Sequence, residues 1–207
     1  MSKKRNLVLF IASSIDGYIA TKDDSRKWLS NVKGEGDNGF TEFYETVDTV
    51  LLGKRTFEWI MEQDAEEFPY KNKECYVFTR PSIEDAKDVK FINEDVTKFV
   101  NKLKRQDGKN IWLVGGGELV DSCIKEKLVD EIIVTIVPTI LGKGIPIFRE
   151  GDYQLDLTLK KTNTFNQFVE LHYVVEKQKF SFIDFAIDMY DAIPFKSTLI
   201  HIWSKSD

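Results

Sequence analysis

Short apolar runs, each bounded by polar residues, recur through most of the chain. Runs of this length are typical of strands buried on both faces of a sheet. They lie at residues 6–12, 48–53, 75–79, 110–115 and 130–138. Between the runs, apolar residues recur with helical spacing, as at Val96, Phe99, Val100 and Leu103. This alternation of strands and helices predicts an α/β fold with a mainly parallel sheet.

The pattern changes near the end of the chain. In residues 155–161 and 168–175, apolar and polar positions alternate, as in strands with one buried face. The sequence TNTFNQ between them predicts the loop of an antiparallel hairpin that closes one edge of the sheet. We expect a single domain over residues 1–177. An aromatic-rich extension follows at residues 178–207, and the sequence assigns it no role.

Composition narrows the class of function. The 207 residues carry a formal charge of −5, and the basic residues form no stripe, which argues against a nucleic-acid partner. No apolar run approaches the roughly 20 residues that a membrane helix needs. Cys75 and Cys123 lie in apolar segments without metal-ligand spacing. We therefore expect a cytoplasmic protein with two buried thiols and no bound metal.

Three consecutive glycines stand where a predicted strand meets a predicted helix. They are Gly115, Gly116 and Gly117 in IWLVGGGEL (111–119). The first amides of a helix have no partner within the helix, and the helix dipole is positive at that end. A phosphate can approach such a turn closely when no side chain intervenes. A tight turn without a ligand is the alternative, because glycine motifs have many false positives.

Two further strand ends carry groups that suit an anion. These are Lys54, Arg55 and Thr56 after Gly53 in LLGKRTFEW (51–59), and Thr79 and Arg80 in YVFTRP (76–81). A triphosphate-binding loop is excluded, because Asp48 stands where that motif requires glycine. Ligands of open α/β sheets gather beyond the carboxyl ends of the strands. Agreement among three strand ends favours a dinucleotide phosphate site over a solvated basic helix start.

Two aspartates in glycine-containing loops are candidates for a carboxylate in the cleft. Asp16 lies in SSIDGYIA (13–20), and Asp37 lies in KGEGDNGF (33–40) ahead of a predicted helix around FTEFYETV. Each has an ordinary alternative, since Asp16-Gly17 is a turn signal and Asp37 can cap a helix. The GxGxxG pattern around Asp37 does not follow a strand, so it is not a dinucleotide fingerprint. The glycines and prolines of VPTILGKGIPIF (137–148) predict a rigid loop. This loop either lines the bottom of a pocket or connects to the hairpin.

Together these segments resemble the dihydrofolate reductase-like superfamily, and within it the stand-alone relatives of the riboflavin-biosynthesis reductase domain, the RibD C-terminal domain. The segments that carry the resemblance are SSIDGYIA, LLGKRTFEW, VFTRP, LVGGGEL and VPTILGKGIPIF, in family order and at family spacing. They cover about residues 6–177. The resemblance implies a three-layer α/β fold with a mixed, mostly parallel sheet and a C-terminal antiparallel hairpin. It also implies NADPH as the cofactor.

The resemblance assigns roles to individual positions. Ala12 and Ile19 match residues beside the nicotinamide, and Thr79 with Arg80 match the site of the adenosine 2′-phosphate. The first phosphate-binding turn corresponds to Gly53, Lys54, Arg55 and Thr56, and the pyrophosphate turn to Gly115, Gly116, Gly117, Glu118 and Leu119. The basic side chains favour NADPH over NADH, because fixed positive groups stabilise a 2′-phosphate.

On the substrate side, Trp28 matches the family's active-site tryptophan, and Thr135 matches a threonine that dihydrofolate reductases bond to their catalytic acid. Asp37 falls at the position of that acid. In the riboflavin branch the aspartate of the SxDG loop, here Asp16, contacts the substrate instead. Asp16 and Asp37 are therefore rival candidates for the catalytic carboxylate.

The expected function is NADPH-dependent hydride transfer to a small heterocyclic substrate, most like the reduction of 5-amino-6-(5-phosphoribosylamino)uracil in riboflavin biosynthesis. Dihydrofolate reductase activity and a non-catalytic nucleotide-binding or assembly role are the alternatives. A deaminase is excluded, since the sequence has no His/Cys metal signature. We expect neither a nucleic-acid nor a membrane partner. Relatives of this branch often dimerise, which leaves a homodimer open.

Overall fold

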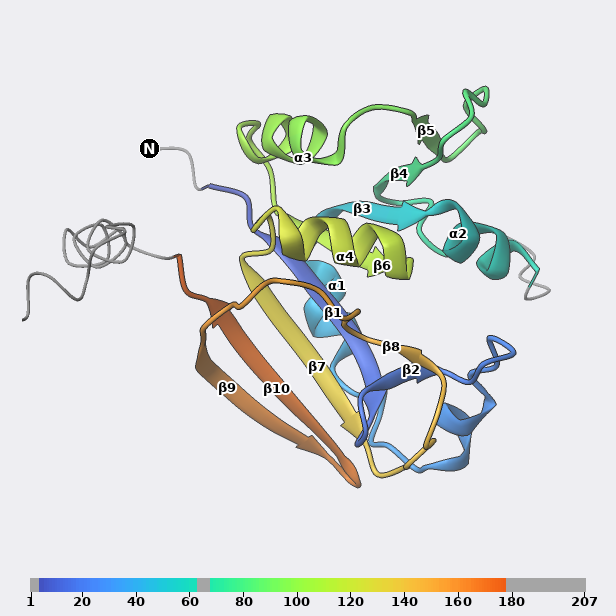
Figure 1. The fold of residues 1–207 in the computed structure, drawn as a ribbon, viewed down its shortest axis with the longest axis vertical. Coiled ribbons are helices and arrows are strands. Elements are labelled where there is room, and N and C mark those ends of the chain that lie inside the picture. Colours follow the sequence, from blue (N-terminus) through green and yellow to red (C-terminus); the bar gives the residue numbers. More distant parts are fainter. Residues whose placement is uncertain (1–3, 63–67, 178–207) are drawn as a thin grey trace, which may run out of the picture. The chain divides into compact units, whose positions relative to one another are not determined.

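The fold centres on an eight-stranded sheet (Figure 1). The computed structural model describes residues 4–62 and 68–177, so the predicted extension at 178–207 lies outside the described residues. The strand order is β5-β4-β3-β6-β1-β7-β10-β9. The strands are β1 (Leu7–Ser14), β3 (Val47–Gly53), β4 (Glu74–Phe78), β5 (Lys90–Ile92), β6 (Asn110–Gly115), β7 (Glu131–Val137), β9 (Leu157–Phe165) and β10 (Phe168–Val175).

The sheet is parallel from β5 to β7, and β10 runs antiparallel to both β7 and β9. The predicted mixed sheet with a C-terminal hairpin is therefore confirmed. Each of the five apolar runs forms one of the central strands, because both faces of those strands are buried. Three short strands escaped prediction, namely β5 and the separate pair β2 (Tyr18–Ala20) and β8 (Ile145–Pro146).

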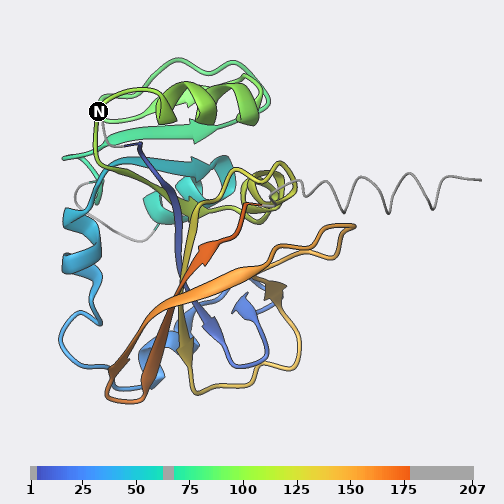
Figure 2. The same ribbon diagram turned by 90° about the vertical axis from the view of Figure 1, so that its left-hand side faces the viewer.

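Helices cover both faces of the sheet. They are η1 (Lys27–Asn31), α1 (Phe40–Glu45), α2 (Lys54–Met61), α3 (Val96–Lys104) and α4 (Gly117–Lys125). Leu7 and Leu9 of β1 pack with α3 and α4, whereas Val8 packs with α1 and α2 on the other face. Figure 2 shows α1 and α4 on opposite sides of the sheet. Successive side chains of a strand are thus buried alternately in two separate cores, which explains why the runs are continuously apolar.

The hairpin differs from its prediction in the length of its turn. β9 continues to Phe165 and β10 begins at Phe168. Most residues of TNTFNQ therefore belong to β9 and not to a loop. A two-residue turn is feasible because Asn166 adopts a left-handed conformation with φ of 57°, which asparagine tolerates better than most residues. Within the hairpin, Leu159 pairs with Tyr173 and Lys161 pairs with His172. Lys160 is therefore an extra residue that forms a bulge.

Two further findings apply only to residues 4–62 and 68–177, which the structure describes. No helix there is both long enough and apolar enough to cross a membrane. Within the same residues, no group of three or more His, Cys, Asp and Glu side chains could hold a metal ion. Cys75 and Cys123 are free and buried, and burial raises the pKa of each thiol to about 12.

Candidate active site

A cavity of about 740 Å³ lies at the carboxyl-terminal ends of β1, β3, β4 and β6. Neighbouring parallel strands end at the same edge of a sheet, so their following loops meet there. The volume falls within the roughly 300–1,000 Å³ of small-molecule sites. Thirteen residues predicted to contact a cofactor line it. They are Ala12, Ile19, Gly53, Lys54, Arg55, Thr56, Thr79, Arg80, Gly115, Gly116, Gly117, Glu118 and Leu119.

The turns that precede α2 and α4 touch each other at their glycines. β3 pairs with β6, so Gly53 at the end of β3 lies beside Gly116. A Cβ on Gly116 would stand 3.0 Å from Cα of Gly53, which is tighter than nine in ten contacts of a Cβ in proteins. Gly116 has φ of 100° and Gly115 has φ of 141°, conformations that other residues rarely adopt. These glycines let the first turns of both helices open into the cavity.

Gly117 needs no conformational freedom of this kind, because it is the first residue of α4. A Cβ there would lie 3.3 Å from a terminal nitrogen of Arg149. Arg149 also lines the cavity, so its guanidinium stands beside the unpaired amides at the start of α4. No sequence motif identified Arg149. It follows the loop 137–148, whose path the sequence left open.

Three of the cations around the cavity are paired with carboxylates. Lys54 contacts Glu58 at 2.5 Å, Arg55 contacts Asp24 at 2.8 Å, and Arg80 contacts Glu118 at 3.2 Å. The side chain of Arg80 is 89% exposed and that of Glu118 is 70% exposed. Exposed pairs of this kind contribute about 0–1 kcal/mol to stability. An anionic ligand can therefore replace the exposed carboxylates of Glu58 and Glu118 at small cost.

A fourth arginine, Arg26, reaches the cavity from the loop between β2 and η1. It contacts Asp24 at 3.1 Å, and its guanidinium lies 4.0 Å from the ring centroid of Trp59 on α2. The pKa of Arg26 is lowered, mainly because its guanidinium is partly buried. Asp24 thus joins Arg26 and Arg55, and this network ties the loop to α2. No local sequence signal identifies it, because its members are distant in sequence.

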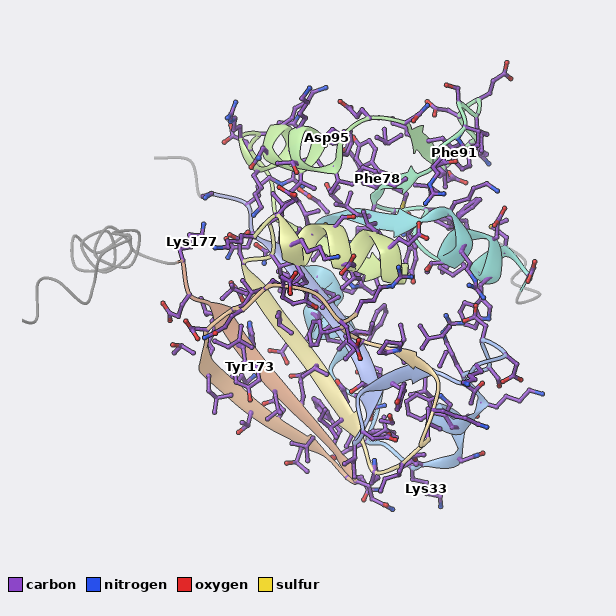
Figure 3. All side chains as sticks on the ribbon, viewed as in Figure 1. Lys33, Phe78, Phe91, Asp95, Tyr173 and Lys177 are labelled. Atoms are coloured by element: carbon purple, nitrogen blue, oxygen red, sulfur yellow. The ribbon has the colours of Figure 1, made fainter. Side chains whose placement is uncertain are left out.

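Aromatic side chains form the apolar part of the lining. Phe10, Trp59, Tyr70, Phe78 and Trp112 all line the cavity. Phe78 lies at the end of β4 and packs edge-on against Phe99 of α3. Phe91 of the neighbouring β5, also labelled in Figure 3, belongs to the core on the other face of the sheet. The residue after Phe78, Thr79, has a hydroxyl that is buried without a hydrogen-bond partner among the described residues. A buried hydroxyl in that state is destabilising unless a ligand or water satisfies it.

Asp16 does not line the cavity. Its carboxylate accepts hydrogen bonds from the Ser14 hydroxyl at 2.6 Å and from the amides of Leu141 and Gly142 at 3.1 and 2.7 Å. The Ser14 bond and these amides lower the pKa of Asp16. The side chain therefore joins the loop after β1 to the loop after β7. This is the turn role that the sequence offered as its alternative.

Asp37 is likewise outside the cavity lining. Its two carboxylate oxygens accept hydrogen bonds from the amides of Gly39 at 3.1 Å and Thr41 at 2.8 Å, at the start of α1. The Thr41 side chain and these amides lower the pKa of Asp37. This arrangement caps α1 and leaves the carboxylate exposed. The structure therefore brings neither predicted acid to the cleft.

The two predicted substrate residues are buried beside the cavity. Trp28 is 7% exposed and packs with Val137 and Phe168, and the cavity residue Ala12 packs against this cluster. Its indole N–H has no acceptor among the described residues. Thr135 of β7 is paired with Ala12 in the sheet.

Comparison with known proteins identifies the family. A model of the RibD C-terminal domain matches residues 5–171. The chain belongs to the RibD C-terminal domain family. A relative in this family, the protein YwjB of Bacillus subtilis (strain 168), is 48% identical over 172 residues, which cover 83% of this chain and 98% of YwjB.

Solved structures show which fold this RibD C-terminal domain protein shares with other proteins. A putative riboflavin biosynthesis protein from Shewanella sp. PV-4 is 26% identical with a TM-score of 0.75, covering 86% of this chain and all of its own. A deaminase/5-amino-6-(5-phosphoribosylamino)uracil reductase from Thermotoga maritima is 16% identical with a TM-score of 0.62, over 84% of this chain and 57% of its own. Dihydrofolate reductase from Enterococcus faecalis, complexed with NADP(H), is 16% identical with a TM-score of 0.60, over 86% and 100%. The fold is therefore dihydrofolate reductase-like.

Proposed function

We propose that this protein is an NADPH-dependent reductase that transfers a hydride to a small heterocycle, most like 5-amino-6-(5-phosphoribosylamino)uracil. The observation that carries the proposal is the cavity, because every position that the resemblance assigns to the cofactor lines it. The family adds support, and so do structures of the same fold described as a uracil reductase and as a complex with NADP(H). A homodimer in the cytoplasm stays a prediction.

The residues present fit a dinucleotide phosphate. Gly115 and Gly116 have positive φ values that favour glycine, so no side chain stands at the start of α4. The free amides and the helix dipole there favour a negative charge. We assign the pyrophosphate to this turn, with Arg149 beside it. Its guanidinium has no carboxylate partner among the described residues.

The 2′-phosphate is assigned to Thr79 and Arg80. The buried hydroxyl of Thr79 lacks a partner among the described residues, and a phosphate oxygen would accept its hydrogen bond. Arg80 can exchange the exposed carboxylate of Glu118 for the doubly charged phosphate. NADH has no group for this site. We therefore expect a preference for NADPH.

The nicotinamide end is assigned to Ala12 and Ile19. Bound NADPH would supply the hydride. Ala12 is small, so a ring can lie close to β1, and the aromatic side chains of Phe10 and Trp112 exclude water from this part of the cavity. The chain's contribution is to align two rings and to hold the substrate's polar edge.

Thermal unfolding of the full chain with NADPH, NADH or no nucleotide tests the proposal. At 100 times its dissociation constant, a ligand adds about 2.7 kcal/mol to the free energy of unfolding. For a chain of this size we expect NADPH to raise the melting temperature by roughly 5–10 °C. NADH should raise it less, and Arg80→Ala should bring the two shifts together. Equal, negligible shifts with both nucleotides in the wild type would refute the proposal.

A further inference from the structure

A row of residues crosses four strands from the cavity to the edge of the sheet. Ala12 of β1 pairs with Thr135 of β7, Thr135 with Glu170 of β10, and Glu170 with Asn163 of β9. Residues paired side by side point to the same face of a sheet. Strands lie about 4.8 Å apart, so Glu170 stands roughly 10 Å from the cavity residue Ala12. Glu170 itself lies outside the cavity lining, on the same face of the sheet as Ala12.

Glu170 is a buried carboxylate with unused hydrogen-bonding capacity. The residue is 8% exposed, and its Oε1 accepts a hydrogen bond from the side-chain amide of Asn163 at 2.7 Å. In the described part of the chain, Oε2 has no hydrogen-bond or ion-pair partner. Glu131 of β7 is equally buried but accepts hydrogen bonds from Asn6, Lys160 and His172. Of these two carboxylates, only that of Glu131 is fully used by the fold.

Trp28 supplies the complementary observation. Its N–H is buried and has no acceptor among the described residues. The ring packs on Val137 and Phe168, which are two residues from Thr135 and Glu170 on the same strands and the same face. A donor without an acceptor thus packs on Phe168, the neighbour on the same face of β10 of a carboxylate with a free oxygen. The buried, unpaired N–H of Trp28 is destabilising unless another molecule bonds to it. The free oxygen of Glu170 keeps some solvent exposure, so the same molecule can reach it.

We propose that Glu170 is the substrate-binding carboxylate of this protein and that Trp28 supplies a hydrogen bond next to it. The free carboxylate oxygen of Glu170 accepts an N–H, and the Trp28 indole donates to a carbonyl oxygen. The ligand class selected is a heterocycle with an N–H next to a carbonyl, as on the edge of an aminouracil. The assignment rests on the proposed reductase function, because that function puts the substrate beside Ala12.

Binding of two aminouracils tests this assignment. 5,6-Diaminouracil carries ring N–H groups, and 5,6-diamino-1,3-dimethyluracil carries none. Each would be titrated into the NADPH-saturated full chain and followed by ligand-observed NMR. We expect Glu170→Gln to weaken binding of 5,6-diaminouracil roughly ten- to a hundredfold, as for loss of a charge-assisted hydrogen bond. The dimethylated compound should bind weakly to wild type and to Glu170→Gln alike.

Glu131→Gln is the matched control. It alters a buried carboxylate on the same face, but Glu131 pairs with Val8, four residues along β1 from Ala12, or about 13 Å. It should leave both affinities unchanged. In Glu170→Gln the new side-chain amide oxygen can still accept from Asn163, so this variant should fold, and its melting temperature checks this. Trp28→Phe is the second variant, and it should weaken both ligands, because each keeps its carbonyl groups.

The outcomes separate the two proposals. Failure of NADPH to bind the wild type refutes the proposed function. If NADPH binds but Glu170→Gln retains wild-type affinity for 5,6-diaminouracil, Glu170 is not the substrate-binding carboxylate. The same holds if neither aminouracil binds the wild-type NADPH complex, or if Glu131→Gln causes an equal loss.

Discussion

Substituting Gly116 by alanine tests whether the contact between the two phosphate turns needs an absent side chain. At φ of 100° and ψ of 109°, a residue other than glycine carries about 1–3 kcal/mol of backbone strain. The new Cβ would also stand 3.0 Å from Cα of Gly53. Backbone cannot rotate away as a side chain can, so overpacking adds about 1–3 kcal/mol. We expect Gly116→Ala to lower the free energy of unfolding by about 2–5 kcal/mol.

The neighbouring glycines provide internal controls. Gly115 has φ of 141°, and a Cβ there would have no atom within 4 Å, so Gly115→Ala should cost only the strain. Its methyl group would stand in open space at the cavity lining and weaken NADPH binding. Gly117→Ala meets only the flexible end of Arg149, and alanine is favoured over glycine in helices by up to about 1 kcal/mol. It should leave stability within about 0.5 kcal/mol of wild type.

Urea unfolding followed by tryptophan fluorescence and circular dichroism measures these differences, provided that the slope of the transition stays constant. The expected order of stability is Gly117→Ala, then Gly115→Ala, then Gly116→Ala. The reasoning is refuted if Gly116→Ala unfolds within about 0.5 kcal/mol of wild type. It is also refuted if Gly117→Ala is as destabilised as Gly116→Ala, since only general crowding of the turn would then explain both.

Four further outcomes follow from the site. Arg149→Met should raise the dissociation constant for NADPH about tenfold, measured by nucleotide fluorescence, whereas Lys143→Met in the loop before β8 should not. Asp37→Ala should lower the melting temperature slightly and leave NADPH affinity unchanged; a large loss of affinity would restore Asp37 as a cleft residue. The Ser14 bond lowers the pKa of Asp16 from 3.8, so the stability difference between wild type and Asp16→Asn should persist at neutral pH and shrink as pH falls below that value. The thiol of Cys123, with a pKa of about 12, should resist iodoacetamide at pH 8 until the chain unfolds, which mass spectrometry of the alkylated protein will reveal.

Much of the fold could be predicted, because buried strands and amphipathic helices have different periods. Helix α3 is an example, since Phe99, Val100 and Leu103 recur with helical spacing and are buried on one face. The short strands β2, β5 and β8 were missed. Strands this short contain too few residues to show a period, and their pairing depends on distant partners.

For the candidate site, motifs identified the strand ends but not the groups supplied by loops. The glycines and basic residues are local signals, because a helix start imposes its own chemistry. Arg26 and Arg149 reach the cavity through loops whose paths depend on packing far along the chain. Asp37 shows the reverse difficulty. A loop aspartate that caps a helix and one that faces a cleft have the same local sequence, so only three-dimensional placement separates them.

The bulge at Lys160 decides which way the outer strand faces. Beyond it, Lys161 shares the face of His172, whereas before it Leu159 shares the face of Tyr173. Removing one residue here would restore simple alternation and turn Leu157 and Leu159 to the opposite side of the sheet. Insertions and deletions are usually tolerated in loops, but at this position a single residue inverts half of an edge strand. We therefore expect related chains to vary the length of the loop before β9 while keeping the spacing between Leu159 and Lys161.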